Sequence, residues 1–197
     1  RKVYGSIMNN YSRDYFITVK NGLDHMVVTD RNGKVLSHDD GLETWADKSE
    51  ELKNKRGIFF FCGNGASATM AEHLSHDCFQ NADFLTETCS ETSHITAISN
   101  DISYEDVFSY RIGKMLGEKD MLITISSSGN SPNIIKAIHT ARELGVFIVT
   151  LSGKKEDNQS RRLGDVNFYV PLDTYGLVES AHAVLLHCWL DMYLDKY

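Results

Sequence analysis

The chain has few of the residues and patterns that mark several large classes of protein. Only two of its 197 residues are proline and four are cysteine. The cysteines lie far apart and form no C-x-x-C pair, which argues against a zinc ribbon and a disulfide framework. No apolar run approaches the ~20 residues that a membrane span requires, and no secretory signal is recognisable. We therefore expect buried thiols, no membrane association and a cytoplasmic protein.

The charge balance narrows the range of partners. A formal net charge of −7 argues against a general nucleic-acid binder, because the phosphate backbone selects basic proteins. Hydrophobic residues make up 42% of the chain, and its length suffices for one domain with a full core but not for two ordinary domains. The expected ligand is a small molecule.

From Gly57 onward the sequence alternates between apolar, β-branched runs and helical stretches, with no linker, repeat or low-complexity segment. This order predicts an α/β fold, a doubly wound five-stranded parallel sheet with helices on both faces. The expected strands lie at 58–62, 84–88, 119–125, 146–151 and 166–170, and the expected helices at 68–80, 93–99, 104–116, 132–144, 157–163 and 177–194.

The first 56 residues have a different pattern. Helical spacing predicts an amphipathic helix within residues 1–24, Asn32-Gly33 predicts a small hairpin, and residues 41–54 predict a second helix. The first helix cannot bury its apolar side alone, so it must dock on the body or on another subunit. We divide the chain into an N-terminal helical extension, residues 1–56, used for packing or oligomerisation, and a ligand-binding domain, residues 57–197. The apolar positions of the first helix are Ile7, Tyr11, Tyr15, Phe16, Val19 and Leu23.

The stretch from Ile125 to Asn133 joins a predicted strand to a predicted helix, and the rest of the chain reads as a scaffold for it. Ser131 is a natural N-cap, and Pro132 fits the first helical position. Free N–H groups, hydroxyls and the positive end of the helix dipole converge there, which suits a phosphate or another anion. Such turns also join strands to helices with no ligand, so both interpretations stay open. The serines of this loop are Ser126, Ser127, Ser128 and Ser131.

A second loop, Gly63-x-Gly65-x-x-Ala68, also follows a strand and precedes a helix. It fits the dinucleotide-binding pattern, with Glu87 as the acid for a ribose hydroxyl, but that reading leaves the serine loop without a role. The alternative is that both loops, at the carboxyl ends of parallel strands, face one crevice and bind one phosphorylated ligand.

Two predicted helices carry histidines and carboxylates. His73 and Asp77 are four residues apart and share a helix face, as a metal-binding pair or an oriented acid/base pair would. On the last helix Glu179 and His182 are neighbours. Glu179 and His187 are separated by ~12 Å of helix rise, but we expect that their side chains can still reach toward one point from two sides. Each histidine taken alone is also compatible with a satisfied core residue.

Taken together, these motifs resemble the sugar-isomerase (SIS) domain, and within that superfamily the phosphoheptose isomerases. The resemblance runs from about residue 57 to 195. It is carried by the segments 61–68 (FCGNGASA), His73, 90–95 (SETSHI), Asn100-Asp101, 125–131 (ISSSGNS) and 151–154 (LSGK).

The resemblance implies a phosphosugar site and an enediol mechanism of proton transfer. It assigns the phosphate to Ser126, Ser127, Ser128 and Ser131, with Asn64 and Ser67 nearby, and it places Glu91 where the family has a substrate-binding aspartate. His73, Asp77, Glu179 and His187 fall on the family's metal ligands, so a divalent metal, with zinc the first candidate, is implied. Asp77, Glu179 and His187 fall on positions that carry the acid/base chemistry. A homotetramer with sites at subunit boundaries is also implied.

Three departures from the family pattern are visible. Asp77 stands in place of a glutamate and is one methylene shorter, and Glu179 stands in place of a glutamine. Residues 173–178 lack the family's Asp-Arg pair and are one residue shorter. We expect this segment to line the sugar, so the difference favours a sugar phosphate other than the usual heptose phosphate.

Our first hypothesis is an aldose–ketose isomerase of sedoheptulose 7-phosphate or a related sugar phosphate, acting in lipopolysaccharide or capsule sugar synthesis. The second is a non-catalytic SIS module that binds a phosphosugar or a protein, like the relative that associates with a replication initiator. The acid/base residues favour the enzyme. A nicotinamide-binding Rossmann domain is a third, weaker alternative.

Overall fold

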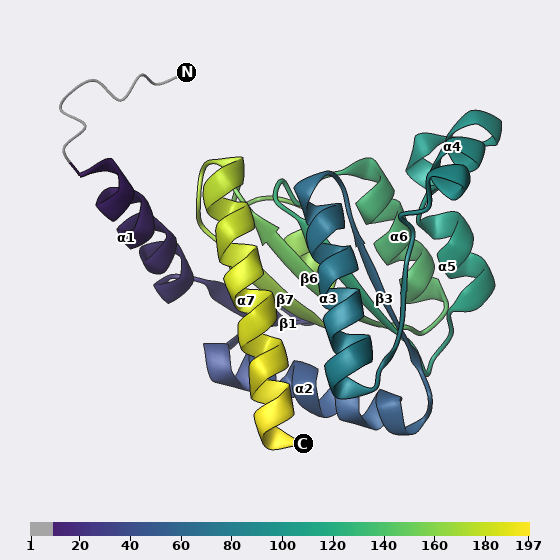
Figure 1. Cartoon of the computed structure of the whole chain (residues 1–197), viewed down its shortest axis with the longest axis horizontal. Helices are drawn as coiled ribbons and strands as arrows, with labels where there is room; N and C mark the ends of the chain where they lie inside the picture. The colour runs from purple at the N-terminus through teal and green to yellow at the C-terminus, as the bar shows by residue number, and fades with distance from the viewer. Residues whose placement is uncertain (1–9) are drawn as a thin grey trace.

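The structure, a computed structural model, describes residues 10–197 and is built around one seven-stranded sheet (Figure 1). The strand order is β2-β1-β7-β6-β5-β3-β4. Strands β3 to β7 run parallel, which confirms the predicted five-stranded parallel sheet. The strands are β1 (Val27–Asp30), β2 (Val35–Leu36), β3 (Ile58–Gly63), β4 (Leu85–Thr88), β5 (Met121–Ser126), β6 (Phe147–Gly153) and β7 (Val166–Val170).

The helices connect these strands largely as the periodicity predicts. Two expected helices are shorter in the structure. Residues 104–116 divide into a 3₁₀ turn, η1, and a short helix, and residues 157–163 contain only the 3₁₀ turn η2. The helices are α1 (Tyr11–Asp24), α2 (His38–Asn54), α3 (Ala66–Ala82), α4 (Thr92–Asp101), η1 (Tyr104–Asp106), α5 (Ser109–Met115), α6 (Pro132–Glu143), η2 (Ser160–Arg162) and α7 (Tyr175–Lys196).

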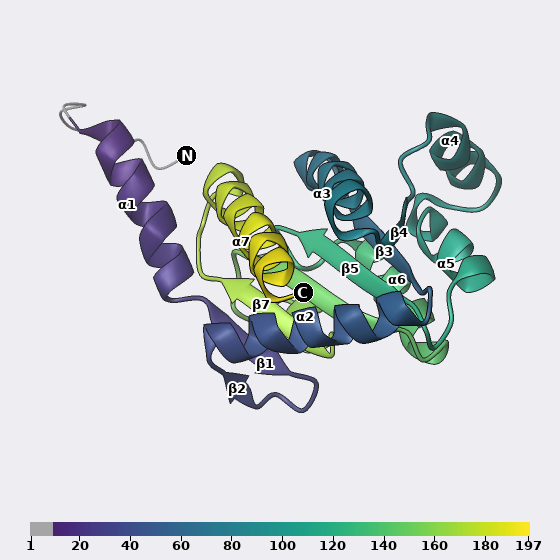
Figure 2. The same ribbon diagram turned by 60° about the horizontal axis from the view of Figure 1, so that its bottom comes forward.

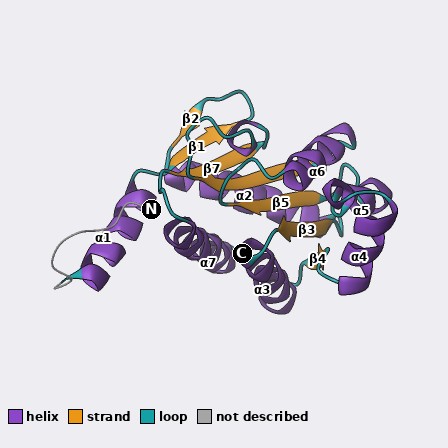
Figure 3. Ribbon diagram, turned by 90° about the horizontal axis from the view of Figure 1, so that it is seen from above, coloured by secondary structure: helices purple, strands orange, loops and turns teal. Residues whose placement is uncertain are grey.

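The sheet separates two apolar cores. Helices α2, α3 and α7 cover one face, and α4, α5 and α6 cover the other. Figure 3 shows α3 and α7 together on one side of the sheet and α6 on the opposite side. Side chains alternate between the cores along each strand. On β3, for example, Phe59 and Phe61 enter the first core, and Phe60 enters the second.

The first core is dominated by aromatic side chains that fix the position of α7. Trp45 on α2 and Trp189 on α7 are both fully buried and stack with ring centroids 3.9 Å apart. Burial of each indole contributes on the order of 3 kcal/mol. Helix α7 is therefore held along its length against α2 and the sheet, which gives the residues of its first turns a defined place.

The N-terminal region contributes to the same sheet. Strand β1 pairs with β2 as the predicted hairpin and also runs antiparallel to β7. Helix α1 extends away from the body (Figure 2). Its residues Tyr15, Val19 and Leu23 pack against the first core, whereas Tyr11 and Phe16 are exposed. Ile7, the first apolar position predicted for this helix, lies outside the described residues.

The order in which successive strands are added to the sheet changes direction between β3 and β5. From β3 it continues outward to β4, and from β5 it continues in the opposite direction to β6 and β7. In doubly wound sheets ligands bind at such a switch point, beyond the carboxyl ends of the strands. The loops that follow β3 and β5 diverge at this point.

Two further expectations concern the cysteines and membranes. Cys62, Cys78 and Cys89 are buried, but Cys188 is exposed on α7, so the expectation that all four thiols are buried is wrong for Cys188. Among the helices of residues 10–197, none combines the length and the apolar character needed to cross a membrane.

Candidate functional site

The loops after β3 and β5 line one pocket, which we call the serine pocket. Its volume is about 160 Å³. The expectation that both loops face a single crevice is therefore confirmed. The pocket is lined by Asn64, Ser67, Ile125, Ser126, Ser127, Ser128, Ser131, Tyr175 and Glu179.

Two hydroxyl groups of the serine loop lack hydrogen-bond partners among the described residues. The hydroxyl oxygens of Ser126 and Ser127 are buried, and neither has a hydrogen-bond partner within residues 10–197. A buried hydroxyl without a partner costs about 1–3 kcal/mol. Ser131 is the N-cap of α6, but its side chain does not bond the helix. The serine loop therefore has hydrogen-bonding capacity that the described residues do not use.

The backbone geometry of the serine loop is held by the segment before β7. Gly129 has φ +62°, and a Cβ there would collide with the Asn158 side chain. The Gly129 carbonyl accepts from the Ser160 N–H at 2.9 Å, and the Asn130 side-chain oxygen accepts from the Gln159 N–H at 3.0 Å. Only glycine combines this conformation with this close approach.

Three helices begin at the pocket. Ser67 lies in the first turn of α3, Ser131 caps α6, and Tyr175 is the first residue of α7. Each helix N-terminus carries about half a positive charge and unpaired N–H groups. Among the described lining residues Glu179 is the single carboxylate, and no lysine or arginine lines the pocket. Three helix N-termini at a pocket that no basic side chain lines are an arrangement suited to an anion.

Tyr175 was not singled out from the sequence, although the segment 173–178 was expected to line the ligand. Its ring lines the pocket, and the Lys154 ammonium lies 3.7 Å from the ring centroid. Lys154 has a left-handed φ of +58°. Its N–H donates to the Leu172 carbonyl, and its carbonyl accepts from the Tyr169 hydroxyl. These contacts hold the backbone of Lys154 in place, and its ammonium lies over the ring of Tyr175.

A second cluster lies farther along the neighbouring helices α3 and α7. One ligand atom each from His73, Asp77 and His187 lie within 4.8 Å of one another. His73 Nε2 is 3.3 Å from a carboxylate oxygen of Asp77, and the rings of His73 and His187 are 5.2 Å apart. Two imidazoles and a carboxylate are a donor set that suits zinc with one open position.

Glu179 is separated from this cluster. It was expected to complete a four-residue metal set, but the group contains only three residues, and Glu179 lines the serine pocket instead. The step of eight positions from Glu179 to His187 corresponds to about 12 Å along α7. The helix pair α3 and α7 thus presents a carboxylate at the pocket and a His/Asp/His group beyond it.

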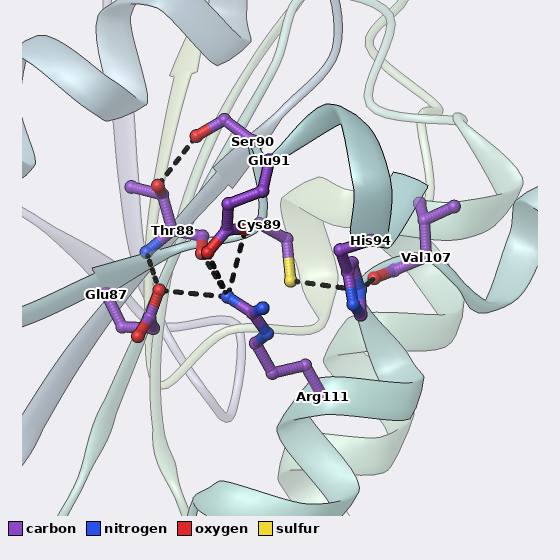
Figure 4. Close-up of polar contacts among 8 residues, drawn as sticks. All are labelled: Glu87, Thr88, Cys89, Ser90, Glu91, His94, Val107 and Arg111. Atoms are coloured by element: carbon purple, nitrogen blue, oxygen red, sulfur yellow. Dashed lines mark hydrogen bonds and ion pairs between the residues drawn. The ribbon is translucent and has the colours of Figure 1, made fainter. Parts of the chain in front are cut away.

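Glu91 does not line the serine pocket. Figure 4 shows its carboxylate on Arg111, with both oxygens accepting at 2.9 and 3.1 Å. The same guanidinium nitrogen donates to Glu87 and to the Thr88 carbonyl. Burial raises the pKa of Glu91, but the hydrogen bonds from Arg111 and the backbone, together with the nearby charges of Arg111 and His94, keep the pKa below its ordinary value. Glu87, considered above as a ribose ligand, is likewise paired with Arg111.

His182 lies between the two groups on α7 and is fully buried. Its Nε2–H donates to the Ser152 carbonyl at 3.2 Å. Burial lowers its pKa to about 4, so it is neutral at physiological pH. It ties the first turns of α7 to the end of β6.

Comparisons with known proteins agree with this architecture. The sequence profile of the SIS domain matches residues 28–153. The phosphoheptose isomerase of Coxiella burnetii (strain RSA 331 / Henzerling II) is 36% identical over 154 residues, which span 73% of this chain and 76% of that protein. That of Helicobacter pylori (strain P12) is 33% identical over 148 residues, spanning 72% and 76%.

Solved structures give the same answer for the fold. A phosphoheptose isomerase from Francisella tularensis superposes with a TM-score of 0.80 at 21% identity and covers 96% of this chain and 97% of its own. The phosphoheptose isomerase from Neisseria gonorrhoeae superposes with a TM-score of 0.78 at 24% identity, covering 93% and 95%. At these identities the likeness establishes the arrangement of helices and strands.

Proposed function

The chain belongs to the SIS domain family, and from that premise we propose that it is a sugar-phosphate isomerase of the phosphoheptose isomerase type. Its relatives above 30% identity carry that name, so sedoheptulose 7-phosphate is the first substrate to test. The earlier expectation of a different sugar, drawn from residues 173–178, stays a prediction. The non-catalytic alternative is not favoured, because carboxylates and histidines stand beside the pocket.

The observation that carries the proposal is the pocket at the switch point of the sheet, which five serines and Asn64 line where α3, α6 and α7 begin. A phosphate there accepts from Ser128, Ser131, Asn64 and Ser67, and from Ser126 and Ser127 once their hydroxyls turn toward it. Glu91 has a lesser role in this proposal because Arg111 occupies its carboxylate. All of the lining residues fall within 57–197, which we therefore propose as the catalytic unit, with residues 1–56 serving packing.

Proton transfer is the proposed task of the carboxylates and His187. A base removes a proton from C1 of the ketose, the C1–C2 enediol forms, and a proton returns to C2 as the carbonyl moves to C1. Glu179, in the pocket itself, and Asp77, in the neighbouring cluster, are the two candidates for the base. His187 is the acid/base partner that moves a proton between the two oxygens.

A divalent metal, with zinc the first candidate, fits the His73, Asp77 and His187 donors described above. When bound, it would polarise the carbonyl and stabilise negative charge on the enediolate. His73 and His187 then serve as neutral ligands, and Asp77 balances the metal's charge. Glu179 joins this set only if the ligand or the helix brings it closer.

The assembly and the compartment are part of the same proposal. The exposed Tyr11 and Phe16 on α1 are apolar surface that a homotetramer would cover. The free cysteines suit a reducing cytoplasm. Size-exclusion chromatography with light scattering tests the tetramer directly.

Solvent deuterium incorporation tests the reaction. In D₂O the enzyme should replace one of the two prochiral C1 hydrogens of sedoheptulose 7-phosphate by deuterium, which reduces the C1 signal in the ¹H NMR spectrum. Asp77→Asn and Glu179→Gln should each slow this by about 100-fold, the usual contribution of a positioned acid or base. Asp83→Asn and Glu43→Gln remove the same charge from exposed positions and should leave it unchanged. No incorporation into any C5–C7 ketose phosphate would remove the proposal.

A further inference from the structure

Asn64, in the loop after β3, forms a reciprocal amide pair with Asn133 on α6. The Asn64 Nδ2 donates to Asn133 Oδ1 at 2.9 Å, and the Asn133 Nδ2 donates to Asn64 Oδ1 at 2.9 Å. Asn133 is 2% exposed and does not line the serine pocket. Asn64 is half-buried and does line it. The two loops of the site are therefore joined through these side chains.

A backbone group determines which way both amides face. The Ile134 N–H donates to Asn133 Oδ1 at 3.0 Å, and a backbone N–H can only donate. Asn133 must therefore present its oxygen on that side and its Nδ2 to Asn64 Oδ1. Asn64 must in turn present its Nδ2 to Asn133 Oδ1. The amide orientations follow from the network rather than from the atom positions alone.

Tyr104 in η1 strengthens the same orientation from the opposite side of the loop. Its hydroxyl donates to Asn64 Oδ1 at 3.0 Å, so this oxygen accepts from both Tyr104 and Asn133. Its two lone pairs are then occupied. The amide nitrogen of Asn64 has two N–H groups, and within residues 10–197 only one has a partner. The other is available to a ligand.

We infer that Asn133 and Tyr104 are positioning residues that fix Asn64 as a hydrogen-bond donor, and not an acceptor, toward the ligand in the serine pocket. The inference rests on the proposed function only for the class of ligand, a phosphorylated sugar. It gives the pocket one more donor for an acceptor oxygen of that ligand. It also means that ligand affinity depends on two residues that do not line the pocket, the buried Asn133 and the exposed Tyr104.

Tyr104→Phe is the gentlest test, because the side chain is 55% exposed and only the hydroxyl is lost. The probes are inorganic phosphate and ribitol 5-phosphate, a sugar-alcohol phosphate with no carbonyl to isomerise, measured by titration calorimetry. A neutral hydrogen bond corresponds to about 3- to 10-fold in affinity, and we expect that loss for ribitol 5-phosphate. Tyr110→Phe, an exposed tyrosine on α5, is the control and should have no effect.

A double-mutant cycle shows whether Tyr104 acts through Asn64. In an Asn64→Ala background, Tyr104→Phe should cause no further loss of affinity. If the two losses are additive, Tyr104 does not act through Asn64, and the inference is wrong. In the isomerase assay, Tyr104→Phe should raise KM by the same factor as Kd and leave kcat within about twofold, since positioning affects ligand binding.

Asn133→Asp tests the buried half of the network. The carboxylate keeps the acceptor for Ile134 but loses the N–H that faces Asn64 Oδ1, so affinity should fall about 10-fold or more. Asn130→Asp adds the same charge to the same loop and keeps the acceptor for Gln159. Both variants should melt within a few degrees of the parent protein, which shows that they are folded. If the loss of affinity in Asn133→Asp does not then exceed the loss in Asn130→Asp, the inference is wrong.

The outcomes for the parent protein separate the two proposals. If the parent protein binds ribitol 5-phosphate but isomerises no ketose phosphate, the proposed function is wrong. The double-mutant cycle on ribitol 5-phosphate affinity then still tests whether Tyr104 positions Asn64. If the parent protein binds neither probe, the pocket is not an anion site and the inference is overturned together with it.

Discussion

Glu179 creates an electrostatic conflict with any phosphate in the serine pocket. A cavity of about 160 Å³ is about 7 Å across, so a bound phosphate lies within about that distance of the carboxylate. At 7 Å, two unit charges repel by about 0.6 kcal/mol at the permittivity of water and by about 2.4 kcal/mol at an effective value of about 20. Glu179→Gln should therefore tighten the binding of inorganic phosphate by about 3- to 60-fold.

The same substitution should weaken catalysis. If Glu179 is the base, Glu179→Gln improves phosphate affinity and reduces deuterium incorporation together, a combination that damage to the fold would not produce. Titration calorimetry at constant pH measures the affinity, and Glu43→Gln on α2 controls for the change in net charge. Unchanged or weaker phosphate binding in Glu179→Gln would refute the placement of the anion beside this carboxylate.

Three further predictions concern metal, pH and packing. Zinc should raise the melting temperature of the protein, as a ligand that binds only the folded state does, and His73→Ala should abolish this shift while His76→Ala on the same helix keeps it. Burial lowers the pKa of His182 to about 4 from 6.5, so the folded state binds fewer protons than the unfolded state between these two values. The free energy of unfolding should therefore fall by about 2 kcal/mol from pH 7 to pH 5, and the dependence should end near pH 4. Urea titrations of His182→Gln should show a smaller change of unfolding free energy with pH, and an unchanged pH dependence would contradict the assignment. Gly153→Ala should destabilise the protein by about 1–3 kcal/mol in urea titrations, because the added Cβ would lie 2.5 Å from Val178 on α7; a neutral effect would show that α7 is not seated on β6 as described.

The parallel sheet and the joint crevice were predictable from sequence because both depend on local pattern. Apolar, β-branched runs such as 58–62 and 119–125 are typical of buried strands, and the loops at the carboxyl ends of neighbouring parallel strands lie at the same edge of the sheet. The pairing of β1 with β7 was not predictable, since it joins Val28 to Phe168 across most of the chain. No local sequence pattern predicts a contact between residues so far apart in the chain.

The candidate site was predicted in part for the same reason. Helical spacing gives the neighbours His73 and Asp77, but it says little about which residues of α7 face them. Glu179 was expected to reach the same metal set as His187 across about 12 Å of helix rise, but the structure groups only His73, Asp77 and His187. Arg111, which occupies Glu91, lies 20 residues away in sequence and on another helix, and only the tertiary fold brings the two together.

The most direct test of the account is a crystal structure of the protein with ribitol 5-phosphate. We predict phosphate density within hydrogen-bond distance of the Ser126, Ser127 and Ser128 hydroxyls, with the polyol directed toward Glu179 and the His73–Asp77–His187 cluster. Phosphate bound elsewhere, or a polyol directed away from α3 and α7, would contradict it.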